Sequence, residues 1–377
     1  MPKTADIFCT IIDNYGDIGV CWRLARQLAS EHRLQVTLWV DDLATFARLA
    51  PALDPQQPDQ RLGDLRVRHW PGEIPDPQPA DLVIEGFGCR LPAGFLAAMK
   101  ARPTPPAWIN LEYLSAETWV EDCHGLASVH PATGLVQTFW FPGFSERTGG
   151  LLREAGLLQA RDRFQADPLE QAGFWERIGV PEALQIERRA SLFAYENAAV
   201  PGLLGALAEA DQPWLLLVPE GRALAQVRAW SGQALQAGDR LVRGALTLVV
   251  LPLLDTDDYD RLLFGCRLNA VRGEDSFVRA QWAGAPLLWH IYPQEEDAHW
   301  VKLEAFVARV EEGAGMPALW AQAQRAWNRG DPDPVLWRAL LADLPVLAGA
   351  ARAWGDHLAR EEDLAAKLMH FCSGRVE

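Results

Sequence analysis

The segment IIDNYGDIGVCWRLARQLA, residues 11–29, joins the end of an apolar run to the start of an amphipathic stretch. We expect a strand over residues 6–12 and a helix over residues 21–31, with a loop between them that carries glycines and acids. A strand that enters a helix through such a loop is the opening unit of a parallel sheet with helices on both faces. The segment therefore predicts a Rossmann-like domain in the first part of the chain.

The same alternation of strand and helix continues along the chain. Further strands are predicted at 36–40, 82–85, 107–111, 135–141, 190–194, 214–218, 246–251, 268–271 and 286–290. The spacing of apolar residues predicts helices at 92–100, 200–208, 223–237 and 277–282, and only helices after about residue 317. Two such series in one chain predict an α/β protein with two doubly wound domains.

The length of 377 residues also favours two domains, because a single hydrophobic core rarely serves a chain of this size. We expect an N-terminal domain at 1–150 and a C-terminal domain at 185–350. The charged, mostly helical stretch 151–184 is expected to lie between them. The proline-rich stretches 51–60 and 71–81 predict surface loops.

The composition narrows the class of partner and the compartment. A formal net charge of -15 argues against a nucleic-acid partner, because phosphate binding needs a basic surface. We find no signal-peptide pattern and no apolar run of about 18 residues, so we expect neither secretion nor a membrane partner. The six cysteines form no CxxC pair, which is typical of reduced thiols in a cytosol. The sequence therefore predicts a cytoplasmic protein.

The loop of the first segment carries candidate functional side chains. Ligands of open α/β sheets bind at the carboxyl ends of strands, and glycines let backbone approach a ligand closely. The loop lacks the GxGxxG fingerprint, and its acids would repel a phosphate. Two carboxylates there suit a general base or a cationic substrate, although Asp17 could instead cap the helix. The candidates are Asp13, Asn14, Tyr15, Gly16, Asp17 and Gly19.

A second candidate loop lies in LNAVRGEDSFVRAQWAGAPLLWHIYPQ, residues 268–294. A helix is expected to start just after Ser276, and its free backbone N–H groups would attract a diphosphate. Glu274 and Asp275 would accept hydrogen bonds from sugar hydroxyls. A capped helix beside a solvated acidic turn is the alternative. The candidates here are Arg272, Gly273, Glu274, Asp275 and Ser276.

Weaker candidates flank the same crevice. Tyr195 follows a predicted strand, where it could stack on a base or bind a phosphate, although core packing fits it too. Tyr292 and Gln294 follow the next predicted strand. The acids of DTDDYD, residues 255–260, lack the glycine and terminal glutamate of an EF-hand, and no other metal-ligand pattern occurs, so no metal site is expected. His290 and His299 are interpreted as structural.

These motifs together resemble the elongation factor P arginine rhamnosyltransferases. The resemblance rests on DNYGDIGVCWRLARQLA and VRGEDSFVRAQWAGAPLLWHIYPQ, and it extends to LEYLSAETWVEDCHGLASVHP, FWFPGF and FAYEN. It runs from the first predicted strand to the last predicted helix.

The resemblance implies a GT-B fold, in which two Rossmann-like domains face a cleft and a C-terminal helix, about 355–377, returns to the first domain. It implies that rhamnose passes from TDP-β-L-rhamnose to one arginine of elongation factor P, with inversion and without a metal ion or other cofactor. The modified factor would then rescue ribosomes stalled at polyproline. The acceptor would bind the N-terminal domain and the nucleotide sugar mainly the C-terminal domain.

The resemblance also implies roles for single residues. Asp17 would be the catalytic base and Asp13 its essential neighbour, while Glu274 would hold the rhamnose or assist catalysis. The residues that would contact the TDP group are Asp275, Ser276, Tyr195 and Tyr292. Thr256 stands where the family pattern has glutamine before DDYD, so one contact to the base or ribose is expected to differ.

Two other classes of function remain open at this point. Another sugar-nucleotide enzyme on the same fold, such as a 2-epimerase, would share the phosphate-binding helix but would need no protein acceptor. A non-catalytic module would bind a protein partner even without Asp13 and Asp17. An NAD-dependent oxidoreductase is disfavoured, because the glycine fingerprint is missing.

Overall fold

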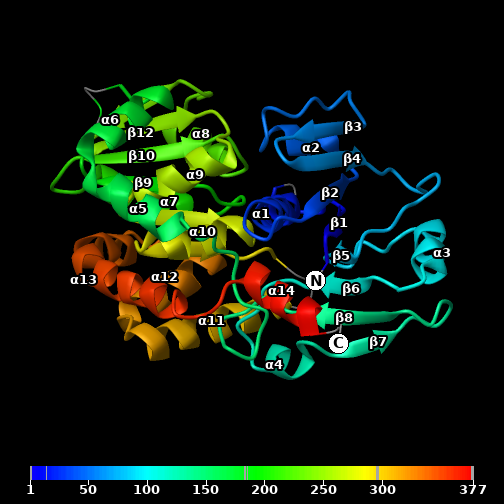
Figure 1. Cartoon of the computed structure of the whole chain (residues 1–377). Helices are drawn as coiled ribbons and strands as arrows, with labels where there is room; N and C mark the ends of the chain where they lie inside the picture. Colours follow the sequence, from blue (N-terminus) through cyan, green and yellow to red (C-terminus); the bar gives the residue numbers. More distant parts are fainter. Residues whose placement is uncertain (1, 14, 182–183, 185, 294–296, 375–377) are drawn as a thin grey trace. The chain divides into compact units, whose positions relative to one another are not determined.

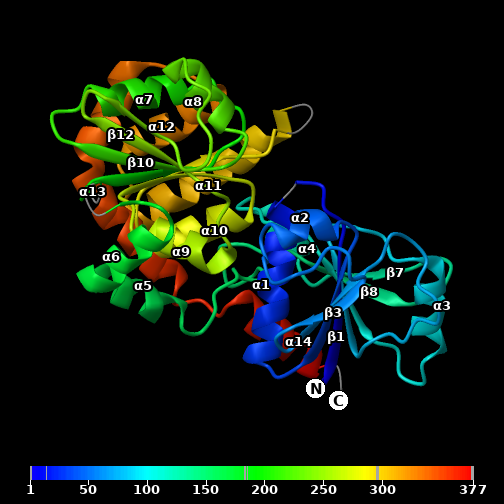
Figure 2. The same ribbon diagram turned by 90° about the horizontal axis from the view of Figure 1, so that it is seen from above.

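The computed structural model describes residues 2–13, 15–181, 184, 186–293 and 297–374. The chain forms two compact units (Figures 1 and 2). The first contains Met1–Ala155 together with Glu361–Glu377, and the second contains Gly156–Arg360.

The first unit is built on an eight-stranded sheet with the order β3-β4-β2-β1-β5-β6-β8-β7. Its strands are β1 (Thr4–Cys9), β2 (Gln35–Val40), β3 (Asp59–Leu62), β4 (Leu65–His69), β5 (Leu82–Gly86), β6 (Ala107–Leu111), β7 (Ala127–Val129) and β8 (Val136–Trp140). All neighbours are parallel except the edge strands β3 and β7. The strand order reverses at β1, which places the switch point of the sheet beside the loop after β1.

The helices of the first unit are α1 (Gly16–Ser30), α2 (Leu43–Ala47), α3 (Ala93–Ala101), α4 (Trp119–Cys123) and α14 (Leu364–Gly374). An aromatic cluster fills one side of the sheet, where Phe8 stacks on Trp39 at 5.4 Å between ring centroids and meets Phe95 edge-on at 4.8 Å. Asp6 is buried beside it and accepts hydrogen bonds from the Trp39 indole and the Ala80 backbone. Satisfying this carboxylate is what allows it to lie in the core.

The C-terminal helix α14 belongs to the first unit and packs against α1 (Figures 1 and 2). Lys367 anchors it by donating to the carbonyls of Ser145, Glu146 and Thr148 at 3.5, 3.2 and 3.0 Å. The returning helix is therefore confirmed. It begins at Leu364, later than the predicted 355, because the preceding helix runs on to Leu358 in the second unit.

The second unit is built on a six-stranded sheet with the order β11-β12-β10-β9-β13-β14. Its strands are β9 (Arg189–Leu192), β10 (Trp214–Pro219), β11 (Arg240–Arg243), β12 (Leu246–Leu251), β13 (Leu268–Arg272) and β14 (Leu287–His290). Only β11, at one edge, is antiparallel. The helices are α5 (Leu157–Ala166), α6 (Pro168–Arg177), α7 (Val200–Ala208), α8 (Leu224–Ser231), α9 (Thr256–Phe264), α10 (Asp275–Ala283), α11 (Ala298–Ala314), α12 (Ala318–Arg329) and α13 (Pro334–Leu358).

The stretch 151–184, expected between the domains, packs from Gly156 onward into the second unit. Arg161 is buried and donates to the carbonyl of Trp282 at 2.9 Å. Trp175 is buried as well and lies under the guanidinium of Arg189 at 4.8 Å. The many charged residues of this stretch made its apolar positions hard to recognise in the sequence, and these positions are the ones with which α5 and α6 pack on the second unit.

The ten predicted strands are present, but the sequence interpretation missed β3, β4, β7 and β11, and also the helices α2, α4, α9 and α11. Three of these strands are antiparallel edge strands, short and partly exposed, so their alternation of polar and apolar residues is weak. The predicted loop 51–60 accordingly ends inside β3. The helix predicted over 223–237 ends at Ser231, because Gly232 adopts a left-handed conformation with φ of 72°.

Within the described residues, α13 alone is long and apolar enough to pass a simple test for a membrane span. Its buried residues recur every three or four positions and include Trp337, Leu340, Leu344 and Leu347. That face packs against α7, α10, α11 and α12, as the apolar stripe of an amphipathic helix does. The two Rossmann-like units, the first of which includes the C-terminal helix α14, confirm the predicted α/β fold class with two doubly wound domains.

Candidate active site

Asp17 closes the loop that follows β1. It lies in the first turn of α1, and its Oδ2 accepts hydrogen bonds from the backbone N–H groups of Ile12 and Asp13, both at 2.9 Å. The N-cap of α1 is Tyr15, not Asp17, so the interpretation of Asp17 as a helix cap is wrong. Asp17 is only 2% exposed. The carboxylate therefore orders the loop that carries the other acid.

Burial raises the pKa of Asp17, and the negative charge of Asp13 acts in the same direction. Hydrogen bonds from the backbone of Asp13 and Ile12, and from the hydroxyl of Tyr113, oppose that rise. Tyr113 follows β6 at the same edge of the sheet. The sequence interpretation assigned it no role.

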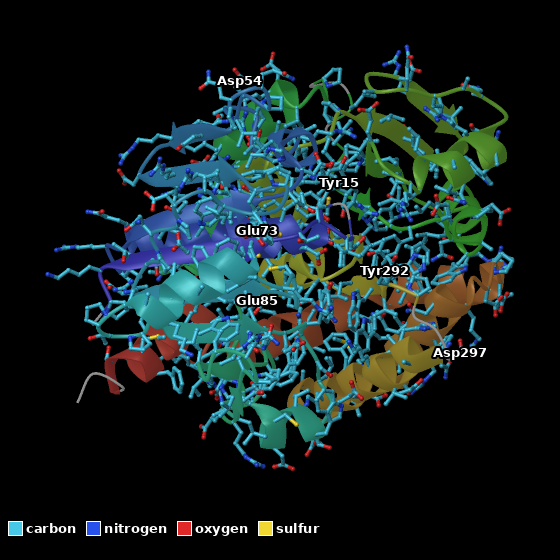
Figure 3. The ribbon with its side chains drawn as sticks, turned by 90° about the vertical axis from the view of Figure 1, so that its right-hand side faces the viewer. Tyr15, Asp54, Glu73, Glu85, Tyr292 and Asp297 are labelled. Atoms are coloured by element: carbon cyan, nitrogen blue, oxygen red, sulfur yellow. The ribbon has the colours of Figure 1, made fainter. Side chains whose placement is uncertain are left out.

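Asp13 is held against the start of α1. A Cβ atom added at Gly16 would lie 2.9 Å from Asp13 Oδ2, closer than real side chains approach, so glycine leaves this carboxylate the room that it occupies. The Gly16 N–H donates to the Asp13 carbonyl at 2.7 Å and tightens the turn. Gly19 lies inside α1 and is buried. Tyr15 (labelled in Figure 3) sits below the guanidinium of Arg48, 5.7 Å from its ring centroid.

The second candidate loop connects β13 to α10. Gly273 has φ of 57°, which favours glycine, and Glu274 is the N-cap of α10. Ser276 holds the turn: its Oγ accepts from the Arg272 N–H at 3.2 Å and donates to the Arg272 carbonyl. Glu274 makes no side-chain cap hydrogen bond on α10, and Ser276 lies inside the first turn of this helix, which begins at Asp275. The positive end of α10 thus faces the loop.

Three predicted residues meet at the carboxyl ends of β9, β13 and β14, which are neighbours in the sheet. The Tyr195 ring meets the Tyr292 ring (Figure 3) edge-on at 5.5 Å. The guanidinium of Arg272 lies 4.8 Å from the ring centroids of both Tyr195 and Phe193. A buried cation among aromatic rings, beside the start of a helix, suits a nucleoside diphosphate.

His290 ends β14 beneath this cluster. It is 7% exposed, its ring lies 5.3 Å from Tyr195, and its Nδ1 has no hydrogen-bond partner among the described residues. Burial lowers the pKa of His290 to about 4, and the charges of Arg272 and His299 act in the same direction. The imidazole is therefore neutral near pH 7.

This shift predicts a stability effect. In the unfolded chain a histidine has a pKa of about 6.5. In the folded protein His290 has a pKa of about 4, so between these two pH values the unfolded chain binds a proton at His290 and the folded protein does not. His290 should thus lower the free energy of unfolding by about 2 kcal/mol between pH 7.5 and 5. Urea unfolding at both pH values, compared with His290→Phe, checks this. The variant should lose less stability on acidification, and an identical loss in both proteins would refute the assignment.

The acidic stretch DTDDYD is accounted for by the fold. Asp255 caps α9 by accepting from the N–H groups of Asp257 and Asp258, Asp258 pairs with Arg177 and Arg261, and Asp260 forms a buried ion pair with Arg279. Thr256 is buried in the first turn of α9. Throughout the described part of the chain, no group of three or more His, Cys, Asp or Glu side chains is arranged to hold a metal ion.

The family is decided by comparison with known proteins. A family model described as Elongation-Factor P (EF-P) rhamnosyltransferase EarP matches residues 5–373. The chain belongs to this family.

Curated relatives and a solved structure agree with the family model. Protein-arginine rhamnosyltransferases of Pseudomonas putida and Pseudomonas aeruginosa are each 53% identical, covering 98% and 97% of this chain and 99% and 98% of their own. A structure described as the basis for EarP-mediated arginine glycosylation of translation elongation factor EF-P superimposes with a TM-score of 0.69 at 39% identity, covering 99% of both chains. The chain is accordingly an enzyme of the glycosyltransferase class.

In this family member the predicted site residues fall into two groups. Asp13, Tyr15, Gly16, Asp17 and Gly19 lie on the loop after β1 and the start of α1 in the first unit. The second group lies at the carboxyl ends of strands in the second unit and comprises Tyr195, Arg272, Gly273, Glu274, Asp275, Ser276 and Tyr292. Asn14 and Gln294 lie outside the described residues.

The sequence interpretation missed several residues that complete these groups. Phe193 and His290 contact Arg272 and Tyr195 in the second unit. Tyr113 and Phe87 stack in the first unit, with ring centroids 4.6 Å apart. Glu85 (Figure 3) is buried in β5, where burial raises its pKa and Gln137 donates to it. Tyr113 lies in the motif LEYLSAETWVEDCHGLASVHP and directly follows a predicted strand, which was the available clue.

Proposed function

We propose that the chain transfers L-rhamnose from TDP-β-L-rhamnose to the guanidinium of one arginine of elongation factor P, with inversion at the anomeric carbon. The observation that carries the proposal is the acid pair Asp13 and Asp17 at the carboxyl end of β1, in a member of this family. A cytoplasmic location and an activated factor that relieves ribosome stalling at polyproline follow from the same proposal.

In this reaction the acceptor arginine would bind at the loop after β1. A guanidinium has a pKa above about 12 and is a poor nucleophile while it stays protonated. Carboxylates can hold it through two parallel hydrogen bonds and orient one nitrogen. Asp13, partly exposed, would hold the cation, and Asp17 would accept the proton as the new C–N bond forms. The two acids therefore have separate roles.

The sugar donor, TDP-β-L-rhamnose, would bind to the second unit. When the bond between the sugar and the diphosphate breaks, the leaving TDP carries the electron pair and needs positive charge nearby. Arg272 and the start of α10 supply that charge without a metal ion, while Tyr195 and Tyr292 offer ring faces to the nucleotide. Glu274 and Asp275, at the first positions of α10, would bind sugar hydroxyls and not phosphate.

Product analysis tests this proposal. Elongation factor P is incubated with the protein and a panel of sugar nucleotides, and tandem mass spectrometry locates the added sugar. NMR of the product then reads the anomeric configuration. We expect transfer from TDP-β-L-rhamnose, the sugar on one arginine, and an inverted anomeric centre. A retained configuration, or sugar on another residue type, would contradict the proposal.

Metal removal is expected to have no effect on the rate. The charge on the leaving diphosphate is assigned to Arg272 and to α10, so a chelator should leave kcat within about twofold of its untreated value. Initial rates before and after dialysis against EDTA, with readdition of Mg²⁺, check this. A rate that falls with EDTA and returns with Mg²⁺ would assign the charge to a metal.

A Gly16→Ala substitution should lower activity without destabilising the fold. The added Cβ would meet Asp13 Oδ2 at 2.9 Å and displace that carboxylate. Alanine stabilises a helix by up to about 1 kcal/mol relative to glycine, and this gain offsets the cost of moving the carboxylate, so the free energy of unfolding should change little. We expect kcat/KM for elongation factor P about tenfold lower.

The matched control for Gly16→Ala is Gly173→Ala. Gly173 lies within α6, and a Cβ there would meet nothing within 4 Å. This variant should keep wild-type activity. Equal activity in the Gly16→Ala and Gly173→Ala proteins would show that the position of Asp13 is not critical.

A further inference from the structure

Asp41 directly follows β2 and contacts the loop after β1. Its Oδ1 accepts a hydrogen bond from the backbone N–H of Ile11 at 3.0 Å, a contact between residues 30 positions apart in the sequence. Strands β1 and β2 pair in parallel, with Cys9 opposite Val40, so both residues lie just beyond the carboxyl end of their strand. The acid at the end of one strand therefore holds the backbone that leaves the next strand.

Carboxylates hold consecutive N–H groups of this loop. Asp41 accepts from Ile11, and Oδ2 of Asp17 accepts from Ile12 and Asp13, both at 2.9 Å. The stretch belongs to no helix or strand, so its backbone donors need partners of this kind. Hydrogen bonds to ionised acceptors are stronger than those between neutral groups. Asp41 and Asp17 thus fix the backbone that leads directly into Asp13.

Asp41 is itself anchored by the neighbouring strand β4, which lies beside β2 in the sheet (Figure 1). Nε2 of His69, the last residue of β4, lies 2.8 Å from the carbonyl oxygen of Asp41. A carbonyl can only accept, so this nitrogen carries the proton and donates. The N–H of Trp70 donates to the carbonyl of Val40 at 3.1 Å and continues the contact between the two strand ends. The sheet therefore fixes the position of Asp41.

The next residue, Asp42, has a different role. Its carboxylate accepts from the Thr45 N–H at 3.0 Å and from the Thr45 hydroxyl at 2.6 Å, which caps the start of α2. Helix α2 thus begins without help from the side chain of Asp41. Two adjacent acids serve two different elements, and Asp41 serves the loop after β1.

We propose that Asp41 is a positioning residue for the transfer reaction, which holds the loop after β1 so that Asp13 can bind the acceptor arginine. This inference rests on the proposed function, in which Asp13 holds the guanidinium. Asp41 acts through the backbone of Ile11 and needs no contact with either substrate. A displacement of 1 Å can cost about 100-fold in rate, so even a small shift of the loop should be measurable.

The test compares Asp41→Ala with Asp41→Asn. Alanine removes the acceptor of the Ile11 N–H, and we expect kcat/KM for elongation factor P about tenfold lower, with the affinity for TDP unchanged. Asparagine keeps an oxygen that can accept the same hydrogen bond, so Asp41→Asn should stay within about twofold of wild type. Equal losses in the two variants would show that the charge itself is needed, and would overturn the positioning role.

The matched control is Asp42→Ala, which removes the neighbouring carboxylate. This variant loses the cap of α2, so its melting temperature should fall, but it should keep the wild-type kcat/KM. A loss of activity as large as that of Asp41→Ala would assign the effect to general destabilisation of this part of the unit, and would overturn the proposal.

Amide hydrogen exchange gives a measurement that does not depend on the reaction. The Ile11 amide should exchange about tenfold faster in Asp41→Ala and at the wild-type rate in Asp41→Asn. Unchanged exchange in the folded alanine variant would overturn the role of Asp41. A wild-type protein that transfers no rhamnose would overturn the proposed function, while the exchange rates would still decide whether Asp41 orders the loop.

A second variant keeps the test decisive if Asp41→Ala is poorly folded. His69→Phe keeps a ring at this position but removes the hydrogen bond to the Asp41 carbonyl, while the carboxylate of Asp41 stays. We expect both effects in the same direction but smaller, with kcat/KM about threefold lower. Wild-type values of kcat/KM and of Ile11 exchange in His69→Phe would overturn the proposal.

Discussion

Asp17→Asn is expected to lower kcat for rhamnose transfer by about 10²- to 10⁴-fold, the contribution of a well-placed general base. Asparagine has nearly the same shape, and its amide oxygen can still accept from the N–H groups of Ile12 and Asp13. The loop should therefore keep its conformation while the proton acceptor is lost. Steady-state rates with elongation factor P measure the effect, and calorimetric titration with TDP should give the wild-type affinity.

The control for Asp17→Asn is Asp42→Asn in the same unit. Asp42 is the N-cap of α2, and its carboxylate accepts from the Thr45 N–H at 3.0 Å and from the Thr45 hydroxyl, both within that cap. This variant can lose up to about 1 kcal/mol of stability but should keep its kcat. Near-normal turnover in Asp17→Asn would remove Asp17 as the base and leave Asp13 as the candidate.

Arg272→Met is expected to weaken TDP binding by about 100-fold. The guanidinium is 5% exposed and lies between two aromatic rings at the carboxyl end of β13, so its charge is poorly screened by water. Hydrogen bonds to charged groups contribute about 1.5–3 kcal/mol each, and methionine preserves much of the side-chain volume. Calorimetric titration with TDP measures the loss, and a thermal melt establishes that the variant is folded.

Arg243→Met is the matched control for Arg272. Arg243 also lies over an aromatic ring of the second unit, with its guanidinium 4.1 Å from the centroid of Trp230, but it is on the edge strand β11 and exposed. Its removal should leave the affinity for TDP unchanged. Equal affinities of the two variants would contradict the placement of the diphosphate beside Arg272.

Much of this architecture could be predicted because central parallel strands are buried on both faces and read as continuous apolar runs. Val83, Ile84, Leu216 and Leu217 are examples, all nearly inaccessible to solvent. Strand β3, with the sequence DQRL, could not be found in this way, since every residue in it is exposed or half-buried. Strand β3 is positioned by its pairing with β4, and such pairing cannot be recognised from the local sequence.

The candidate site residues can likewise be separated into those that the sequence indicated and those that it did not. Asp13, Asp17 and the Arg272–Ser276 loop were chosen from the sequence because they lie near the end of a predicted strand, where this fold binds ligands, and the structure places them at the carboxyl ends of β1 and β13. Their roles stay predictions. Tyr113 could not be assigned from the sequence, because it is far along the chain from the loop after β1, and only the order of β1, β5 and β6 in the sheet brings the ends of these strands to one edge.

The most direct test of the account is the intact mass of elongation factor P after incubation with this protein and TDP-β-L-rhamnose. We expect the mass of elongation factor P to increase by one deoxyhexose with the wild-type protein and with Asp42→Asn. With Asp17→Asn we expect almost no increase over the same time. No gain with the wild-type protein, given a cognate acceptor and an intact donor, would contradict the proposed reaction. An equal gain with Asp17→Asn would contradict the active site described above.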